Sequence, residues 1–593
     1  MVGPMKLFSS CDLPRNTFNF GNLRLESDGI LQRGDTAIHL PPKELMALRL
    51  LLQHAGQIVT HQQIRQALWG DVHVTADSVP KCVSALRNRL QPDGNCIQTV
   101  YKRGYRLAVD ARRNEFPPEN GLPRLAIMPF GTEFNVAAHI GQAVAEETVS
   151  LLVKEPLAPA HILARDSVFT LARRGNTAQQ VGETLGADLV LTGAVRALPD
   201  HFRLRAEMIR VADGTQMWVE DLLVPRSRVA GMESELARRL LARLGNGGLS
   251  LSAAGAGGAD QNHPNCREAY ELFLRGHHEW QTLQRHRMQD GLQHLFRAVE
   301  LNPSLVAAHI DLANASIAQE LFGFMSPALA AEQVRLAAEA IPASTEGSEA
   351  ILPALGWIRF HVDHDLAGAL RAFRTSAYLP HDTAITRARS MFALGRHCFG
   401  EAIGLLSAAL QSDPFSPWLI ARLAWAYHLA EDSARSLFQI ERALELFPEH
   451  ESSNLYGAII LAFNGEADRA ISLAEKLIRR SPYFDLAAAV HGYALACAGR
   501  REEARGILER LQWHSRERFV LNSFTPALLV ALGDLDGALA EMNTAAEIRC
   551  PWFFQMLADP RLKILHQRPE FARMQKLLDG MESSGKRHVA NET

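Results

Sequence analysis

Small residues and prolines recur every 34 positions through the second half of the chain. The small residues are Ala402, Ser436, Ala470, Ala504 and Ala538, and the prolines are Pro380, Pro414, Pro448 and Pro482. A small residue lets two helices approach closely, and a proline ends the second helix of each unit. A period of 34 is typical of tetratricopeptide repeats. The pattern therefore predicts five helix pairs, within an all-α solenoid that spans residues 266–580.

Earlier units in this solenoid depart from the strict period. Pro303, Pro342 and Pro380 are 39 and 38 residues apart, which indicates repeats with short insertions or degenerate helix pairs. Stacked repeats are expected to expose a concave groove that binds a peptide or a partner protein. An array that serves only self-association is the alternative, because repeat grooves bind many kinds of partner.

The first hundred residues follow a different pattern. Alternating apolar residues from Phe18 to Leu25 predict short strands. A helix follows, with Pro42 in its first turn and Gly56 closing it. A second helix begins with a T-x-x-Q capping box at Thr60 and Gln63 and ends at Trp69-Gly70.

A third helix is predicted to begin near Ser78. Its inward face is apolar, with Val79, Val83, Leu86 and Leu90 spaced 4, 3 and 4 residues apart. The outward face carries Ser78, Lys81, Ser84, Ala85 and Asn88, with Arg87 and Arg89 on its flanks. The segment IQTVYKRGYRLAV then reads as a hairpin with Lys102, Arg103 and Gly104 at its tip. Residues 17–109, hereafter the head, are therefore predicted to form a winged helix-turn-helix.

Charge supports a nucleic-acid partner for the head. Residues 1–113 hold 15 Lys and Arg against 9 Asp and Glu, whereas the whole chain has a net charge of −3. A basic head on an acidic body is expected where one domain meets phosphate. Lys81 can reach guanine O6 and N7, and Arg87 and Arg89 can neutralise phosphates. Ser84 and Asn88 are short polar residues that can form hydrogen bonds with base edges. A head that makes only protein contacts is the alternative.

The head resembles the output domain of the OmpR/PhoB response-regulator family. The resemblance is carried by LPPKE at 40–44, Trp69-Gly70, SALRNRL at 84–90 and TVYKRGYRL at 99–107. It implies that the third helix enters the major groove of double-stranded promoter DNA and that Lys102 and Arg103 approach the minor groove. It also implies phosphate contacts at Lys43 and Thr60. The loop residues expected to face RNA polymerase are Asp71, Val72, His73 and Val74. Positions 84 and 85, often basic in this family, are Ser and Ala here.

A polar linker at 110–122 precedes a predicted α/β middle domain at 123–244. Strands and helices alternate there, and a hairpin turns at Asp213-Gly214. VGETLGADLVLTGAV and ADGTQMWVEDL resemble the middle domain of bacterial regulators of the ToxR/CadC and adenylate-cyclase-associated type. A Gly/Ala/Ser-rich linker is expected at 245–265 and a polar tail at 581–593. The fold class is multidomain, with α and α/β parts.

Several functions are disfavoured by the sequence. No run of eighteen apolar residues occurs, which predicts a cytoplasmic protein without a membrane span. The seven scattered cysteines indicate neither disulfides nor a zinc site. GMESSGKR at 580–587 imitates a phosphate-binding loop but has Arg587 in place of the hydroxyl residue and no preceding strand. His361 and His364 are expected to be solvated residues at a turn. No catalytic constellation, cofactor or metal site is predicted, so the chain is not expected to be an enzyme.

The order of head, middle domain and repeats resembles the HilA-type invasion-gene regulators. LPPKE, LWGD at 68–71, KCVSALRNRL at 81–90 and DPRLKIL at 559–565 carry this closer resemblance. It implies a cytoplasmic bacterial activator of type III secretion and virulence genes that binds direct repeats near promoters and recruits RNA polymerase. Three alternatives stay open. They are a regulator gated by a small molecule or peptide bound to the middle domain or repeats, a nucleotide-hydrolysing switch, and a scaffold that binds proteins at both ends.

Overall fold

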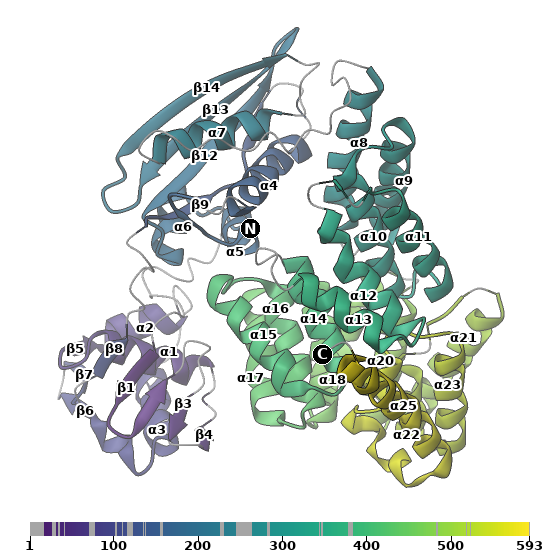
Figure 1. Cartoon of the computed structure of the whole chain (residues 1–593). Helices are drawn as coiled ribbons and strands as arrows, with labels where there is room; N and C mark the ends of the chain where they lie inside the picture. Colours follow the sequence, from purple (N-terminus) through teal and green to yellow (C-terminus); the bar gives the residue numbers. More distant parts are fainter. Residues whose placement is uncertain are drawn as a thin grey trace.

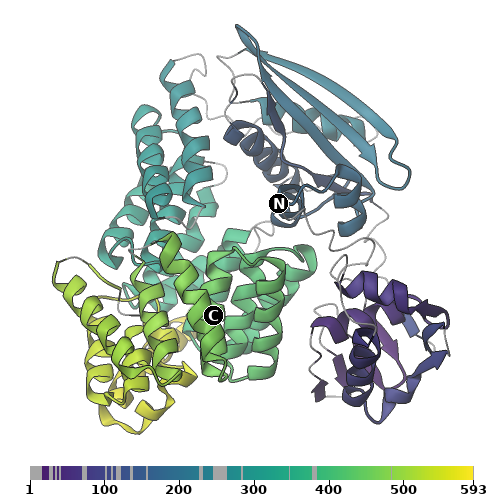
Figure 2. The same cartoon turned by 180° about the vertical axis from the view of Figure 1, so that it is seen from behind.

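The computed structural model shows three groups of elements in chain order, namely the head, the middle domain and the helical repeats (Figure 1). In both views the head lies below the middle domain (Figure 2). The residues that the structure describes are 17–25, 31–33, 36–38, 40, 42–69, 77–100, 103–108, 111–114, 122–133, 136, 138–154, 158–225, 231–244, 264–281, 285–342, 344–345, 348–376, 383–481, 484–517, 519–521 and 523–591.

The head opens with a five-stranded antiparallel sheet in the order β4-β3-β2-β1-β8. Its strands are β1 (Thr17–Phe20), β2 (Leu23–Leu25), β3 (Leu31–Arg33), β4 (Thr36–Ile38) and β8 (Ala111–Asn114). The predicted alternation is confirmed, since Phe18, Phe20, Leu23 and Leu25 are all buried. Strand β8 lies in the segment that the sequence assigned to a linker. It pairs with β1, with Phe18 opposite Arg113, so the head continues to residue 114.

The three predicted helices of the head are confirmed as α1 (Pro42–Gln53), α2 (His61–Trp69) and α3 (Ser78–Arg89). A second sheet in the order β5-β7-β6 closes the domain, with β5 (Ile58–Thr60), β6 (Ile97–Val100) and β7 (Gly104–Leu107). The 3-10 helix η1 (Asp93–Cys96) joins α3 to β6. Helix α3 begins at Ser78, as predicted, and its N-cap residue is Asp77, whose side chain makes no capping hydrogen bond.

The middle domain is a mixed sheet in the order β11-β9-β12-β13-β14, with β10 beside β12. The strands are β9 (Arg124–Ile127), β10 (Gly131–Glu133), β11 (His161–Ile162), β12 (Leu189–Ala197), β13 (His201–Arg210) and β14 (Gln216–Pro225). The helices are α4 (Ala138–Lys154), α5 (Arg165–Arg173), α6 (Ala178–Leu185) and α7 (Met232–Leu244). On β13, Phe202, Leu204, Ala206 and Met208 are buried and alternate with more exposed residues. One face of this strand therefore packs into the core.

Helices α8 to α23 build the repeats. They are α8 (Pro264–Trp280), α9 (Arg285–Leu301), α10 (Val306–Leu321), α11 (Pro327–Glu339), α12 (Leu352–His361), α13 (Leu366–Thr375), α14 (Thr383–Gly395), α15 (Phe399–Ser412), α16 (Pro417–Leu429), α17 (Ser433–Leu446), α18 (Glu451–Phe463), α19 (Ala467–Arg480), α20 (Asp485–Cys497), α21 (Arg501–Glu517), α22 (Thr525–Leu532) and α23 (Leu535–Glu547). The short 3-10 helix η4 (Ser348–Ile351) precedes α12. The five recurring small residues are completely buried, as close helix packing requires.

The inner side of the repeats is covered by the chain's own C-terminal segment, which forms α24 (Phe553–Met556), η6 (Pro560–Gln567) and α25 (Pro569–Asn591). Trp552 Nε1 donates to Leu321 O at 2.9 Å, and Trp425 Nε1 donates to Gln555 Oε1 at 2.9 Å. Phe553 and Phe554 are buried. The groove that the sequence predicted to be open is therefore occupied here. Helix α25 also replaces the expected polar tail as far as residue 591.

The middle domain is joined to the repeats by buried polar contacts. Ser167 N donates to Asp413 Oδ1 at 2.9 Å, and Phe415 N donates to Ser167 Oγ at 2.8 Å. On the α8 side, His277 Nε2 lies 3.1 Å from Glu146 Oε2. Because these groups are largely buried, the middle domain and the repeats form one continuous packed body.

The structure also describes two features for which the sequence analysis predicted no chemical role, namely His361 and the segment 580–587. His361 is buried and makes hydrogen bonds to Trp357 O and Glu320 Oε1, each at 2.6 Å, so the expectation of a solvated side chain is wrong. The segment 580–587 continues helix α25 and is not a loop between a strand and a helix. Within the described parts of the chain, no helix is long and apolar enough to cross a bilayer.

Candidate nucleic-acid interface

Helix α3 is held against the head by its apolar face. Val79, Val83, Leu86 and Leu90 are buried and belong to the core formed with α1 and the strands. The apolar face predicted from the spacing of these residues is therefore confirmed. As a result, the polar residues of α3 point away from the core.

The outward face of α3 is available for contact. Lys81, Ser84 and Asn88 are exposed, and Ser78 and Ala85 are half-buried. One cation and two short polar side chains therefore lie on one side of a 12-residue helix. A helix with such a face fits the major groove, where Lys reads guanine and Asn reads adenine.

Arg87 occupies a place that the sequence did not predict. Its Nε and Nη2 donate to Ile97 O at 2.9 and 2.6 Å, and Nη2 also donates to Thr99 Oγ1 at 2.8 Å. The guanidinium lies 5.6 Å from the ring of Tyr105. These contacts tie α3 to both strands of the wing. We assign Arg87 to the positioning of the wing on the helix, and any phosphate contact would have to share this guanidinium.

Arg89 is also engaged within the head. Its Nε lies 2.8 Å from Glu44 Oε2, which joins the end of α3 to the first turn of α1. Burial raises the pKa of Glu44, and Arg89 opposes that shift. The Arg89 side chain is still 44% exposed, so one face of its guanidinium reaches solvent.

Lys43 is exposed on the first turn of α1 but lies near the repeats. Burial raises the pKa of Glu445 on α17, and the positive charge of Lys43 opposes this. Phe438, also on α17, is part of the hydrophobic cluster of the head. Lys43, which was expected to bind phosphate, thus lies near the carboxylate of Glu445 in the repeats.

The wing is the hairpin of β6 and β7, in register from Ile97–Leu107 to Val100–Gly104. Arg103 is in the turn and is exposed. Gly104 has φ +148, and a Cβ there would collide with the carbonyl oxygen of Val59 on β5. Only glycine therefore lets β7 lie against β5 at this point. Lys102 lies outside the described residues, as do Asp71, Val72, His73 and Val74.

Thr60 forms the predicted capping box with Gln63. Thr60 N donates to Gln63 Oε1 at 2.8 Å, and Gln63 N donates to Thr60 Oγ1 at 3.2 Å. Thr60 is exposed and ends β5 beside the wing. The side chain is thus already used as a helix cap, and a phosphate contact would have to share it.

Arg33 is a residue of this region that sequence reasoning missed. Its Nη2 donates to Leu90 O at 2.8 Å, and Nε donates to Asp93 Oδ2 at 3.1 Å. It therefore satisfies a carbonyl at the end of α3. No local pattern marks it, because β3 has only three residues. Among the described residues, no group of three or more His, Cys, Asp and Glu could hold a metal ion.

A winged helix with an exposed polar recognition face is the class of domain that this geometry defines. Residues 35–107 match the family model described as "Transcriptional regulatory protein, C terminal". The chain is 24% identical over 578 residues to the transcriptional regulator HilA of Salmonella typhimurium, covering 94% of this chain and 99% of that protein. The resemblance inferred from the sequence is confirmed by these matches.

Two further proteins are similar over part of the chain. A putative adenylate cyclase 3 of Rhizobium meliloti is 24% identical over 255 residues, which is 41% of this chain and 42% of that protein. The crystal structure of the yeast protein Tom70 has a TM-score of 0.32 and 14% identity, covering 55% of this chain and 69% of that one.

Proposed function

We propose that the protein is a sequence-specific regulator of transcription that binds promoter DNA through α3 and the wing. The observation that carries the proposal is the exposed face of Lys81, Ser84 and Asn88, on a helix that Arg87 fixes relative to the wing. The match of residues 35–107 and the similarity to a transcriptional regulator over nearly the whole chain support it. No enzymatic activity is part of the proposal, and the expected site of action is the cytoplasm.

The test is selection of genomic DNA fragments by the purified full-length protein at physiological salt. We expect enrichment of a repeated motif upstream of genes, and we expect the double variant Lys81→Ala/Arg103→Ala to lose it. Arg505→Gln, an exposed change on α21 far along the chain, is the matched control and should enrich the same motif. Failure of the wild type to enrich any motif would leave the head as a protein-contact module.

We further propose that the protein activates invasion genes of the type III secretion class, as the resemblance to invasion-gene regulators given in the sequence analysis implies. In this proposal, the loop Asp71–Val74 contacts RNA polymerase. Transcription from an enriched promoter with purified RNA polymerase tests it. Asp71→Ala and His73→Ala should lower transcript yield while leaving DNA affinity unchanged. Unchanged transcription in both variants would contradict this role for the loop.

The repeats are proposed to bind a protein or peptide partner or to join two copies of the chain. The inner side of the repeats is filled by residues 552–562, so this partner would use the outer surface. Sedimentation of the full-length protein over a range of concentrations distinguishes self-association from binding of a different partner. A concentration-dependent dimer supports self-association, and a strict monomer favours a different partner.

A further inference from the structure

Arg422 is a buried cation in the core of the repeats. It lies on α16, and its side chain is only 3% exposed. Within the described residues, no carboxylate lies within ion-pair distance of it, and its Nε and Nη1 have no hydrogen-bond partner. Nη2 lies 3.5 Å from Met391 Sδ, and the Tyr456 hydroxyl is a side-chain hydrogen-bond partner of the guanidinium. Burial of an isolated charge is costly unless a charge of opposite sign is close.

The guanidinium of Arg561 is also buried, but its positive charge is paired with a carboxylate. Arg561 is 7% exposed, and its Nε and Nη2 donate to the carboxylate of Asp559 at 2.6 to 3.1 Å. Asp559 accordingly keeps a lowered pKa, despite burial, because of Arg561 and His428. Arg561 therefore brings its own counter-charge, whereas Arg422 does not.

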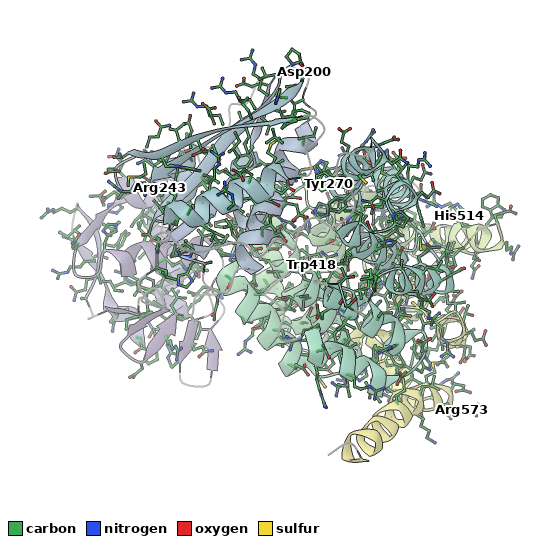
Figure 3. All side chains as sticks on the ribbon, turned by 45° about the horizontal axis from the view of Figure 1, so that its top comes forward. Asp200, Arg243, Tyr270, Trp418, His514 and Arg573 are labelled. Atoms are coloured by element: carbon green, nitrogen blue, oxygen red, sulfur yellow. The ribbon has the colours of Figure 1, made fainter. Side chains whose placement is uncertain are left out.

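Aromatic rings surround Arg422. Its Cζ lies 5.2 Å from the ring centroid of Trp418, 5.3 Å from that of Tyr456 and 5.5 Å from that of Trp552. Trp418 and Arg422 share one face of α16, Tyr456 comes from α18, and Trp552 comes from the C-terminal segment. In Figure 3 the labelled Trp418 lies near the middle of the molecule, whereas His514 lies at its margin. The rings attract the cation, and the Tyr456 hydroxyl accepts a hydrogen bond from the guanidinium, while Nε and Nη1 are left without an acceptor.

The same aromatic cluster contains a second free donor. Gln555 uses its Oε1 to accept from Trp425 Nε1, and its Nε2 has no partner. Trp425 and Trp552 are stacked edge to face with centroids 6.4 Å apart. Another guanidinium, that of Arg387, lies 5.4 Å from the Trp418 ring. The cluster therefore offers positive charge and N–H donors between apolar walls.

We propose that Arg422 binds the carboxylate of a small organic acid, with Trp418, Tyr456 and Trp552 around it. A guanidinium matches a carboxylate through paired N–H donors. One uncompensated positive charge fits a monoanion, and aromatic walls fit an apolar ligand body. This site concerns the repeats alone and holds whether or not the head binds DNA.

The test uses the full-length protein with sodium benzoate as the probe and sodium chloride at equal ionic strength as the reference. We expect either a bound organic acid in the native mass spectrum of the purified protein or a saturable rise in melting temperature of roughly 2–4 °C with benzoate. Benzamide, which lacks the charge, should give no rise. Absence of both a bound acid and a benzoate response would overturn the proposal.

Variants assign the effect to this site. Arg422→Gln should abolish the benzoate response, and Arg505→Gln, on an exposed ion pair with Glu502, should keep it. Gln555→Glu places a carboxylate of the chain in the cluster. It should raise the melting temperature without benzoate and remove the response, which tests the site even if Arg422→Gln does not fold. A response that persists in Gln555→Glu, or that follows the tripeptide Gly-Gly-Phe but not benzoate, would contradict the proposal.

Discussion

At the scale of single residues, Lys81 and Arg87 show how one helix divides two tasks. Lys81 is exposed on the outward face of α3. If it reads a guanine, Lys81→Ala should cost about 1–3 kcal/mol at one base pair and relax the preference there. Competition binding on sites varied one base pair at a time measures this. An equal loss on every sequence would show that Lys81 contacts phosphate instead.

Arg87 is predicted to act on stability and only indirectly on DNA. Arg87→Ala removes two donors from Ile97 O and one from Thr99 Oγ1, so it should lower the free energy of unfolding of the head by about 1.5–3 kcal/mol. Denaturant unfolding followed by amide exchange of β6 and β7 measures the loss.

The salt dependence of DNA binding separates Arg87 from Arg103. Arg103→Ala should reduce the slope by about one unit if one phosphate contact is lost, and it should leave unfolding unchanged. Arg87→Ala should leave the slope unchanged. A reduced slope with normal stability in Arg87→Ala would place its guanidinium on phosphate and contradict the assignment made from the structure.

The sequence was enough to place these residues on α3 but not to find their partners. The polar face follows from helical spacing, which is local. The partner of Arg87 is a carbonyl ten residues away that only the folded hairpin brings close. His361 shows the same limit, because its partner Glu320 is 41 residues distant. Side-chain contacts of this kind depend on packing and leave no local pattern.

At the scale of helices and strands, the recurring small residues set how closely the repeats pack. Ala470 on α19 is completely buried. Ala470→Leu inserts three carbon atoms into a filled helix contact and should destabilise the protein by about 1–3 kcal/mol or more. The midpoint and slope of urea unfolding measure the change.

Gly506 provides the opposite prediction in the next repeat. It lies inside α21, and a Cβ built there would meet nothing within 4 Å. Gly506→Ala should therefore stabilise the helix by about 0.5–1 kcal/mol, because it lowers the backbone entropy lost on folding. A loss of stability in this variant would mean that the α21 surface is covered by something else.

Long periodic elements were predictable and short ones were not. The period of 34 gave the repeat helices, and the alternation in the middle domain gave β12, β13 and β14. Strands β3, β4 and β5 have three residues each, too few to display a period. Strand β8 was missed because its pairing with β1 joins residues nearly a hundred positions apart.

At the scale of the whole molecule, the seam between the middle domain and the repeats contains a carboxyl group with an unusual titration. Asp413 accepts hydrogen bonds from Ser167, and its Oδ2 is buried without a partner. Burial raises the pKa of Asp413 to about 7, with further help from Asp166, while Ser167 and Arg165 oppose the shift. The folded protein therefore holds a proton at this site that the unfolded chain releases near pH 4.

The sign of the resulting pH effect follows from proton linkage. Between about pH 4 and pH 7 the folded state binds one more proton at Asp413 than the unfolded state, so this group lowers the free energy of unfolding as pH rises through that range. Above about pH 7 Asp413 is ionised in both states, so its destabilising effect no longer changes with pH. We therefore expect the contact between the middle domain and the repeats to be most stable in mildly acidic solution. Asp413→Asn keeps a neutral group of the same shape and should remove this dependence.

Unfolding midpoints of the wild type and Asp413→Asn from pH 5 to pH 8 test the linkage. Glu233 is also buried with its pKa raised to about 7, so the wild-type curve contains more than one group. The difference between the two proteins isolates Asp413, since Glu233 is present in both. We expect the variant to gain on the wild type steadily up to pH 7 and then to keep a constant advantage. A constant difference across the whole range would mean that Asp413 is already ionised in the seam, and that Arg165 outweighs burial there.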